Sequence, residues 1–497
     1  MKKILLIILV SIILFSLFSC GGDTKNNVVT PTENKPVETS GETPVSEPGK
    51  PEKIIYTDDL GEYNFGGYKY TMLTRNTTWY RGLYDVAEET GDVLDDAIYR
   101  RNRRVEERFN FTFHEIPGNE YESSRNMAKK SIQAGDNSFD LITLALSENL
   151  ITFVPQGLVH PIHALPHINL DKPYWDKKLN DDILIANKLY LAIAAFNLPI
   201  YDYTKTMLFN KSMLKNLALE SPYELVKANK WTFDKFEEMA KAALKDVNGD
   251  GKWDKSDIYG YLSAAHYVLP DFWLAAGVKT IEKDKDGVLY SAMGEQKFFD
   301  VFTKIFEMTR DTNIWFYNDS WDNFDEGINS RMFQNNQGLF MECTFFFMNT
   351  LRGMETDFGI IPHPKFNEAQ DKYYARIEGG VSFIVPVTAD NESLERTSVI
   401  LEAMACESLN SVIPAYYDIA LKTKNARDEE SEEMIDIIFA NRVLDFGDAI
   451  WYDDIRNGVM RDLYVKNNRN LASKLESMER VIKKRSDELV AAFEKLP

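Results

Sequence analysis

Residues 68–146 alternate between apolar strands and amphipathic helices, and this alternation constrains the fold of the chain most strongly. Strands are predicted at 68–74, 110–116 and 139–146, with helices at 93–109 and 123–134. A β-α-β-α-β order implies a parallel sheet covered by helices. Open sheets of this kind bind ligands at the carboxyl ends of their strands. The loops after Thr74 and Leu146 are therefore expected to border a site.

The rest of the chain continues the mixed pattern. Further strands are expected at 188–196, 205–209, 338–341 and 357–361, the last two leading back to the first sheet. Thr232 is the expected N-cap of a helix over 233–245. The other helices are expected at 211–216, 298–309, 328–335, 393–410, 430–440 and 471–493.

The N-terminus predicts export and lipid attachment. Two lysines precede the apolar run 4–18, and Ser19-Cys20 ends it in the pattern of a lipobox. The run is short for a membrane span, although a plain anchor helix is the alternative reading. We expect residues 1–19 to be a signal peptide and the Cys20 thiol to carry the lipid. Residues 20–52 are rich in Pro, Thr, Ser and Glu, which predicts a disordered tether.

Composition excludes some partners. The formal net charge is −20, and it becomes −22 when Lys2 and Lys3 leave with the signal peptide. An acidic chain repels phosphate backbones, so we expect no nucleic-acid binding, whereas neutral or cationic ligands suit this charge. Beyond Cys20, the cysteines are Cys343 and Cys406. A disulfide between them is possible in an exported protein, but their apolar contexts favour two buried free thiols.

Two long segments carry a resemblance to a known family. Residues 208–244 read LFNKSMLKNLALESPYELVKANKWTFDKFEEMAKAAL, with the FNK element and the WTFDKF helix start. Residues 337–386 begin QGLFMECTFFFMNTLRG and continue through FGIIPHPKF to GGVSFIVP. Together with residues 398–431, these segments resemble bacterial extracellular solute-binding proteins, the lipoprotein receptors of ABC importers, in the carbohydrate class.

This resemblance implies an α/β protein with a two-lobed, periplasmic-binding-protein-like fold and a ligand cleft between hinged lobes. Lobe one would comprise residues 53–195 and 338–410, and lobe two residues 196–337 and 411–497. The protein would be a monomer without enzymatic activity, would bind a sugar or oligosaccharide, and would deliver it to a membrane permease. It would be lipid-anchored and face the extracellular or periplasmic side. Closure of the lobes by hinge bending would present a changed surface to the permease.

A second motif predicts a structural Ca²⁺ site in lobe two. Residues 246–257 read DVNGDGKWDKSD, with a glycine at position 6 where a calcium loop turns sharply. The expected ligands are Asp246, Asn248, Asp250, the Lys252 carbonyl, Asp254 and Asp257. Asp257 replaces the usual Glu, and an apparent strand follows, so the element resembles helix–loop–strand. An acidic Asx-turn loop is the alternative.

Candidate cleft residues follow from sugar chemistry, in which aromatic rings stack on apolar faces and polar groups bond hydroxyls. The candidates are Trp79, Glu148, Tyr203, Trp273, Phe345, Glu378 and Tyr416. His160, His163 and His167 are separated by prolines, so a metal site there is disfavoured. A glycoside hydrolase with paired carboxylates remains an alternative function, as does a receptor for another solute.

Overall fold

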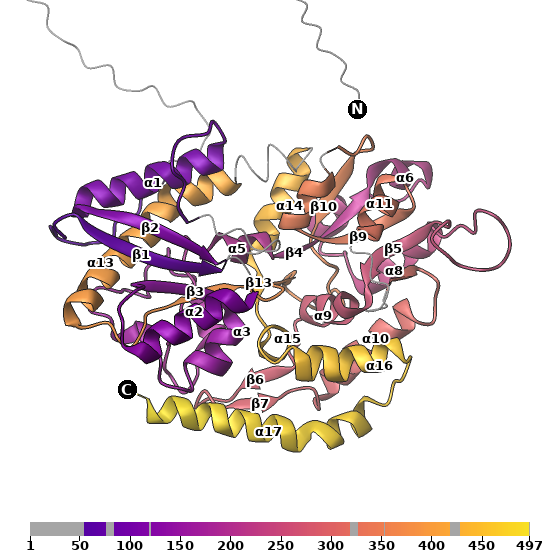
Figure 1. The fold of residues 1–497 in the computed structure, drawn as a ribbon. Helices are drawn as coiled ribbons and strands as arrows, with labels where there is room; N and C mark the ends of the chain where they lie inside the picture. The colour runs from indigo at the N-terminus through magenta and orange to yellow at the C-terminus, as the bar shows by residue number, and fades with distance from the viewer. Residues whose placement is uncertain are drawn as a thin grey trace, which may run out of the picture. The chain divides into compact units, whose positions relative to one another are not determined.

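The three strands predicted in residues 68–146 form the sheet of a first lobe in the computed structural model (Figure 1). The structure describes residues 54–75, 84–118, 121–318, 327–351, 353–417 and 428–496. The sheet order is β12-β3-β1-β2, in which β1 runs parallel to both β2 and β3, while β12 is antiparallel to β3. Their bounds are β1 Tyr68–Arg75, β2 Phe111–Gly118, β3 Leu141–Ala145 and β12 Val381–Ile384. The predicted parallel arrangement is confirmed.

Helices α1 (Val93–Phe109), α2 (Tyr121–Ala134) and α13 (Asn391–Glu407) pack in this lobe. The carboxylate of Asp92 caps α1 by accepting hydrogen bonds from the backbone N–H groups of Leu94 and Asp95. Asn110 ends the helix with a φ of 53°, in the left-handed region. These local signals place the start of β2 directly after α1.

A five-stranded sheet forms a second lobe, with the order β10-β4-β9-β5-β8. The bounds are β4 Lys205–Asn210, β5 Tyr259–Ala264, β8 Trp315–Asn318, β9 Gly338–Thr344 and β10 Phe358–Ile361. The prediction that 338–341 and 357–361 return to the first sheet is wrong, because β9 and β10 both pair with β4. Residues 338–361 therefore belong to lobe two. A strand buried on both faces looks alike in either sheet, so its pattern does not reveal its partner.

The helices of the second lobe flank this sheet or follow its strands. They are α6 Lys211–Asn216, α7 Pro222–Lys227, α8 Phe233–Ala242, α9 Ala265–Ala275, α10 Gln296–Thr309, α11 Ile328–Gln334, α14 Glu429–Ala440 and α16 Asp462–Val465. The predicted cap is confirmed, since the Thr232 hydroxyl accepts the Lys235 N–H of α8. Helix α8 ends three residues earlier than expected.

The chain passes between the sheets through short segments. Helix α5 (Leu198–Asp202) precedes β4, strand β11 (Ala375–Arg376) lies between β10 and β12, and the π-helical turn η4 (Ser408–Val412) follows α13. Strand β11 pairs in parallel with β13 (Arg442–Val443). These two strands thus lie side by side where the lobes meet.

The strand expected at 188–196 is absent, and only isolated bridges form there. Side chains satisfy its backbone instead. The Asn180 side chain exchanges hydrogen bonds with both backbone groups of Ile193, and the Asn197 side chain accepts the Ala194 N–H. Residues 189–196 are buried, as their apolar character predicts, but they do not form the regular hydrogen bonds of a β-strand.

The remaining elements of the described part of the chain are mostly short. They are α3 Leu146–Glu148, η1 Asn149–Phe153, η2 Ile162–Ala164, α4 Lys177–Ile183, β6 Ile281–Lys283, β7 Leu289–Ser291, α12 Phe345–Met348, η3 Asn349–Leu351, α15 Phe446–Ala449, the π-helix η6 Asp453–Arg461 and α17 Leu471–Lys495. Within the described ranges, no helix has both the length and the apolar character that crossing a bilayer requires.

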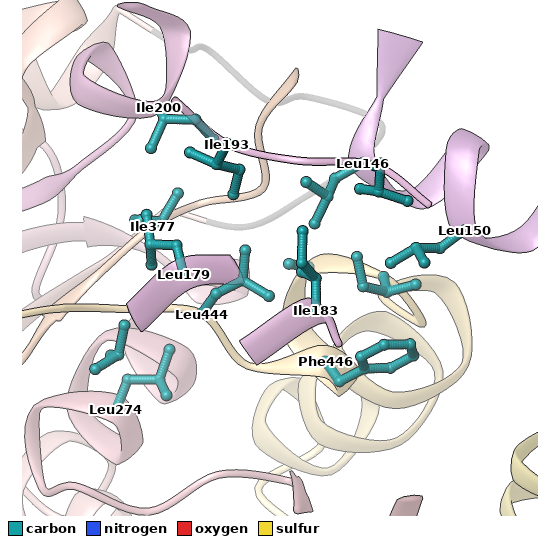
Figure 2. Packing of buried hydrophobic residues seen from close by; sticks show 14 of the residues in the cluster. Leu146, Leu150, Leu179, Ile183, Ile193, Ile200, Leu274, Ile377, Leu444 and Phe446 are labelled. Carbon is teal, nitrogen blue, oxygen red and sulfur yellow. The ribbon is translucent and has the colours of Figure 1, made fainter. Parts of the chain in front are cut away.

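The main hydrophobic core continues from the first lobe past the crossing segments. Figure 2 shows Leu146 and Leu150 in the same cluster as Ile377 of the crossing, Leu274 of α9 and Phe446 of α15. Burial of such side chains supplies most of the stabilisation of both lobes. Cys343 and Cys406 are buried free thiols, which confirms the preferred reading of these cysteines.

Candidate functional site

A cavity of about 230 Å³ lies at the carboxyl ends of β1 and β3, beside the crossing segment that follows β11. This is the position at which open α/β sheets bind ligands. The lining side chains are mainly polar and come from both sides of the crossing. They are Arg75, Ala145, Ser147, Glu378, Gly379, Gly380, Asp448, Ala449, Tyr452 and Arg456.

The first-lobe wall is built from the ends of β1 and β3. Arg75 is the last residue of β1, and its guanidinium lies 3.9 Å from the carboxylate of Glu148. Arg125 lies 3.8 Å from the same carboxylate, which also accepts the Ala145 N–H at 3.2 Å. Burial raises the pKa of Glu148, and the Arg75 charge opposes that rise. Glu148 therefore lies behind the cavity wall and helps to hold Arg75 in it.

Two glycines bring the backbone to the edge of the cavity. Gly379 and Gly380 have φ values of 87° and 153°, which residues other than glycine rarely adopt. A Cβ atom on Gly380 would meet Ile200 at 2.3 Å. The carbonyl of Gly380 accepts the Leu146 N–H at 2.9 Å, which ties the crossing segment to the end of β3.

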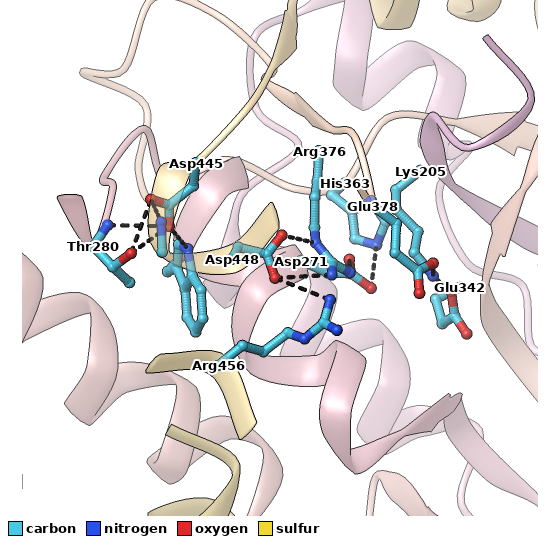
Figure 3. A network of polar contacts seen from close by, with 12 residues as sticks. Lys205, Asp271, Thr280, Glu342, His363, Arg376, Glu378, Asp445, Asp448 and Arg456 are labelled. Carbon is cyan, nitrogen blue, oxygen red and sulfur yellow. Dashed lines mark hydrogen bonds and ion pairs between the residues drawn. The ribbon is translucent and has the colours of Figure 1, made fainter. Parts of the chain in front are cut away.

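A buried lysine joins two carboxylates at the crossing. The Lys205 ammonium, in β4, lies 2.8 Å from Glu342 of β9 and 2.9 Å from Glu378 (Figure 3). It also lies 3.5 Å from the centre of the Tyr267 ring. Burial would raise the pKa of Glu378, but the Lys205 and Arg376 cations outweigh burial and lower it to about 2. Glu378 is thus a charged acceptor at the cavity surface.

The second carboxylate that contacts Lys205, that of Glu342, is not part of the cavity lining and is in a different environment. Burial raises its pKa to about 7, against the pull of Lys205. The negative charge of Asp271 adds to the rise. The Lys205 ammonium therefore contacts two buried carboxylates whose pKa values differ. Glu378 keeps its charge, whereas Glu342 titrates near neutral pH.

Asp448 of α15 anchors the second-lobe wall. Its carboxylate accepts hydrogen bonds from Arg376 at 2.6 and 3.0 Å, and from Arg456 of η6 at 3.4 Å (Figure 3). The remaining Arg376 nitrogen donates to Asp271 of α9 at 2.9 Å. Tyr452 stands one residue before η6 and presents its ring beside Arg456, whose guanidinium lies 5.5 Å from the ring centre.

Asp445, three residues before Asp448, holds the adjacent loop. It accepts hydrogen bonds from the Thr280 backbone and hydroxyl and from the Trp273 indole at 3.1 Å. Burial raises the pKa of Asp445 to about 6. Trp273 is 1% exposed and belongs to this support, so it does not line the cavity.

The structure brings some predicted residues together and separates others. Glu378 lines the cavity and Glu148 lies directly behind its wall. Phe345 and Tyr416 are buried elsewhere, where Phe345 stacks on Phe439 and the Tyr416 hydroxyl donates to Asp202 at 2.9 Å. Tyr203 is also buried and stacks on Phe346. Trp79 lies outside the described residues.

Sequence reasoning missed Arg75, Asp448, Tyr452 and Arg456. Arg75 could have been found, since it directly follows the predicted strand 68–74, at the edge where ligands bind. The other three come from a helical stretch that gives no such signal. The bond from Arg376 to Asp448 joins α15, which lies beside η6, to the crossing.

A second cavity of about 300 Å³ lies near the start of α4 and the crossing segment 195–201. Arg442 of β13 lines it, bonded to Asp176 at 2.6 Å and lying 4.3 Å from the centre of the Tyr201 ring. Arg442 stands opposite Ala375 in the ladder, so it lies on the other face of the ribbon from Arg376. The described residues that line this second cavity include no carboxyl end of a strand of the four-stranded sheet, so the first cavity is the candidate ligand site.

The predicted calcium loop follows α8 and precedes β5, in the helix–loop–strand order expected. The Asp246 carboxylate accepts the Gly249 and Gly251 N–H groups at 2.7 and 2.8 Å. Asp257 is fully buried and accepts the N–H groups of Val247 and Asp254. Across the described residues, no three or more His, Cys, Asp or Glu side chains converge as metal ligands would.

Comparison with solved structures identifies the fold. A sugar transporter protein from Rhizobium etli matches with a TM-score of 0.57 and 15% identity, covering 83% of this chain and 99% of the other. A cyclic α-maltosyl-1,6-maltose binding protein from Arthrobacter globiformis matches with a TM-score of 0.56 and 12% identity, covering 86% and 100%. An ABC substrate-binding protein from Listeria monocytogenes, in complex with cycloalternan, matches with a TM-score of 0.52 and 12% identity, covering 84% and 99%.

Comparison with protein-family models gives no match, and comparison with curated proteins gives none either. At these identities the structural likeness establishes the fold. The chain has the two-lobed α/β fold of ABC-transporter solute-binding proteins, which confirms the fold class predicted from the sequence.

The raised pKa of Glu342 predicts how stability varies with pH. Its folded-state pKa of about 7 exceeds the unfolded value of about 4.3, so the folded protein holds this proton more tightly. The contribution is complete below about pH 4 and is lost as the pH rises through 7. Glu342→Gln should remove this fall in a comparison of urea unfolding at about pH 5 and about pH 7.5.

The exposed Glu392 provides the matched control, since Glu392→Gln should leave the pH dependence unchanged. An unchanged pH dependence in Glu342→Gln would contradict the assignment of a near-neutral pKa to this buried carboxyl.

Proposed function

We propose that this chain is the substrate-binding protein of an ABC importer, and that it captures a sugar or oligosaccharide in the cavity beside Glu378 and Tyr452. The proposal rests on one observation above all. A polar cavity with an aromatic side chain lies at the carboxyl ends of β1 and β3 in a fold whose compared members bind saccharides. In this proposal a membrane permease receives the ligand, and Cys20, outside the described residues, holds the protein at the membrane.

The chemistry of the lining suits a polyhydroxyl ligand. Carboxylates of Glu378 and Asp448 accept hydrogen bonds from hydroxyl groups, and the guanidinium groups of Arg75 and Arg456 donate them. The Tyr452 ring offers a flat apolar surface for the face of a sugar ring. Other side chains of the protein already hold Glu378 and Asp448 in place. Binding a ligand therefore costs little side-chain conformational entropy.

The cavity carboxylates do not favour a glycoside hydrolase. Such an enzyme needs one carboxylic acid that keeps its proton near neutral pH. The pKa of Glu378 is lowered to about 2, and Asp448 accepts from two guanidinium groups. We therefore favour capture of an intact ligand over hydrolysis.

Ligand binding should raise the midpoint of thermal unfolding in a panel of glucose, maltose, maltotriose and cycloalternan, because the ligand stabilises only the folded state. With the best ligand, Tyr452→Ala should weaken binding about three- to tenfold in calorimetry, whereas Tyr452→Phe keeps the ring and the affinity. The exposed Tyr290 is the matched control, and Tyr290→Ala should bind normally.

Recovery of the bound saccharide unchanged supports a receptor, and its cleavage would contradict one. Normal affinity in Tyr452→Ala would place the ligand elsewhere. In cells, Cys20→Ser should move the protein from the membrane fraction to the soluble fraction if the lipid is the anchor.

We further propose that residues 246–257 bind Ca²⁺ with the low affinity, about 10⁻⁴–10⁻³ M, of extracellular modules. Support comes from the oxygen-bearing side chains at positions 1, 3, 5, 9 and 12 and from two glycines with positive φ in the turn. Millimolar Ca²⁺ should raise the thermal midpoint, and Tb³⁺ should emit on excitation of Trp253 within the loop. Asp246→Asn with Asp250→Asn should abolish both effects.

The exposed turn 284–287 (DKDG) supplies a control of similar composition. Asp284→Asn with Asp286→Asn should leave both Ca²⁺ effects unchanged. The calcium assignment would fail if the loop variant responded to Ca²⁺ as the unaltered chain does.

A further inference from the structure

The C-terminal helix α17 begins on the second lobe. The Tyr464 hydroxyl of α16, just before it, donates to Thr309 of α10 at 2.7 Å, and the Tyr464 ring packs on Trp315 of β8. Arg469 then pairs with Asp311 at 2.9 Å. These contacts attach the start of α17 to the elements around the five-stranded sheet.

The same helix ends on the first lobe. The Lys188 ammonium donates to the backbone carbonyls of Phe493 at 3.0 Å and Glu494 at 3.4 Å, and to that of Leu496. The Phe493 ring meets the Tyr190 ring edge-on, with centres 5.3 Å apart. The final turn of α17 is therefore held by the segment around Lys188.

The segment around Lys188 belongs to the first lobe. Ala192 forms an isolated bridge with Phe383 of β12, and the Leu189 carbonyl accepts the Ile162 N–H. Phe383 lies in the four-stranded sheet, and Ile162 begins η2 in the same lobe. A helix of 25 residues, about 37 Å long at 1.5 Å per residue, thus connects the two lobes outside the crossing segments.

The contact at the end of α17 has a clear physical basis. The last carbonyl groups of a helix have no donor within the helix, and they carry partial negative charge. Lys188 supplies both hydrogen bonds and positive charge from the other lobe. Separation of the lobes would expose these carbonyls and the buried Phe493 ring together.

The middle of α17 is tied to the cavity. Arg485 forms an ion pair with Asp454 in η6, the helix that carries Arg456. Ser486 donates to the Leu289 carbonyl of β7 at 2.5 Å, and Figure 1 shows α17 running beside β6 and β7. A movement of α17 can therefore displace η6 and, with it, Arg456 in the cavity wall.

The hairpin β6–β7 makes a second bridge beside it. Lys279, before β6, pairs with Asp182 of α4 at 2.6 Å. Lys283 donates to the carbonyls of Asp181 and Asp182 at 2.5 and 2.8 Å. The hairpin and α17 therefore both contact the first lobe, and they lie beside each other.

We propose that α17 is a clasp between the lobes, and that its last turn must leave Lys188 and Tyr190 when the lobes swing apart. The clasp sets the balance between closed and open forms before any ligand binds. This inference goes beyond the proposed function, since it depends on the contacts of α17 and holds whatever the ligand is.

The test measures the distance between the lobes without ligand. Spin labels go on two exposed positions, through Glu107→Cys in α1 and Lys230→Cys before α8, in the full chain carrying Cys20→Ser. Cys343 and Cys406 are buried and stay unlabelled. Lys188→Met keeps the apolar stem but removes the cap, and it should raise the population at long distances about two- to fivefold.

Lys484→Met is the matched control, because Lys484 is exposed on the same helix and pairs with Glu488 within that helix. It should leave the distances unchanged. Phe493→Leu is a second, milder variant and should also favour the long distances. Circular dichroism checks that each variant is folded.

Unchanged distances in folded Lys188→Met and Phe493→Leu would overturn the clasp and leave α17 as a packing element. Loss of folding in both variants would also overturn it, because a clasp opens without unfolding either lobe. The outcome is independent of the saccharide panel, so the clasp and the proposed function can fail separately.

Discussion

The guanidinium of Arg376 joins three parts of the chain that are far apart in sequence. It lies in the crossing strand β11, pairs with Asp448 of α15 on two nitrogens, and reaches Asp271 of α9 with the third. All three side chains are buried. Removing one partner of such a group leaves an uncompensated charge and costs about 3–5 kcal/mol. The position of α15, and with it the second-lobe wall of the cavity, depends on this contact.

Lys205 performs a related task at the other side of the crossing. Its ammonium holds Glu378 at the cavity surface, while Glu342 shares the same partner from behind. The charged groups of the site are therefore placed before a ligand arrives, which reduces the ordering that binding requires. Such a cavity suits a ligand recognised by many directed hydrogen bonds. The clasp formed by α17 adds a mechanical constraint, because it acts on the lobes that bound this cavity.

The sequence predicted local structure better than long-range placement. The strands and helices of residues 68–146 were recognised because their apolar patterns differ in period. The return of 338–361 to the second sheet was missed, since apolar strands buried on both faces carry no mark of their partner. The run 188–196 was buried as expected, yet the side chains of Asn180 and Asn197 replaced the ladder.

The candidate site divides in the same way. Glu378 was predicted from its place on the returning hairpin that the resemblance implied, and it lines the cavity. Phe345 was chosen as an aromatic residue that follows a strand, and Trp273 as one that lies shortly before Gly277. An aromatic side chain is as readily buried in support of a site as exposed within it. Tyr452 and Arg456 depend on a contact, Arg376 with Asp448, that joins residues 72 positions apart. No local pattern reports such a contact.

The most direct test of the ligand site is a crystal structure of the protein with the saccharide that gives the largest thermal shift. We expect the sugar in the cavity between Arg75, Glu378 and Tyr452, with one ring against Tyr452 and hydroxyl groups bonded to the carboxylate of Glu378. A saccharide bound in the second cavity beside Arg442, with the first cavity closed by its own side chains, would contradict this assignment.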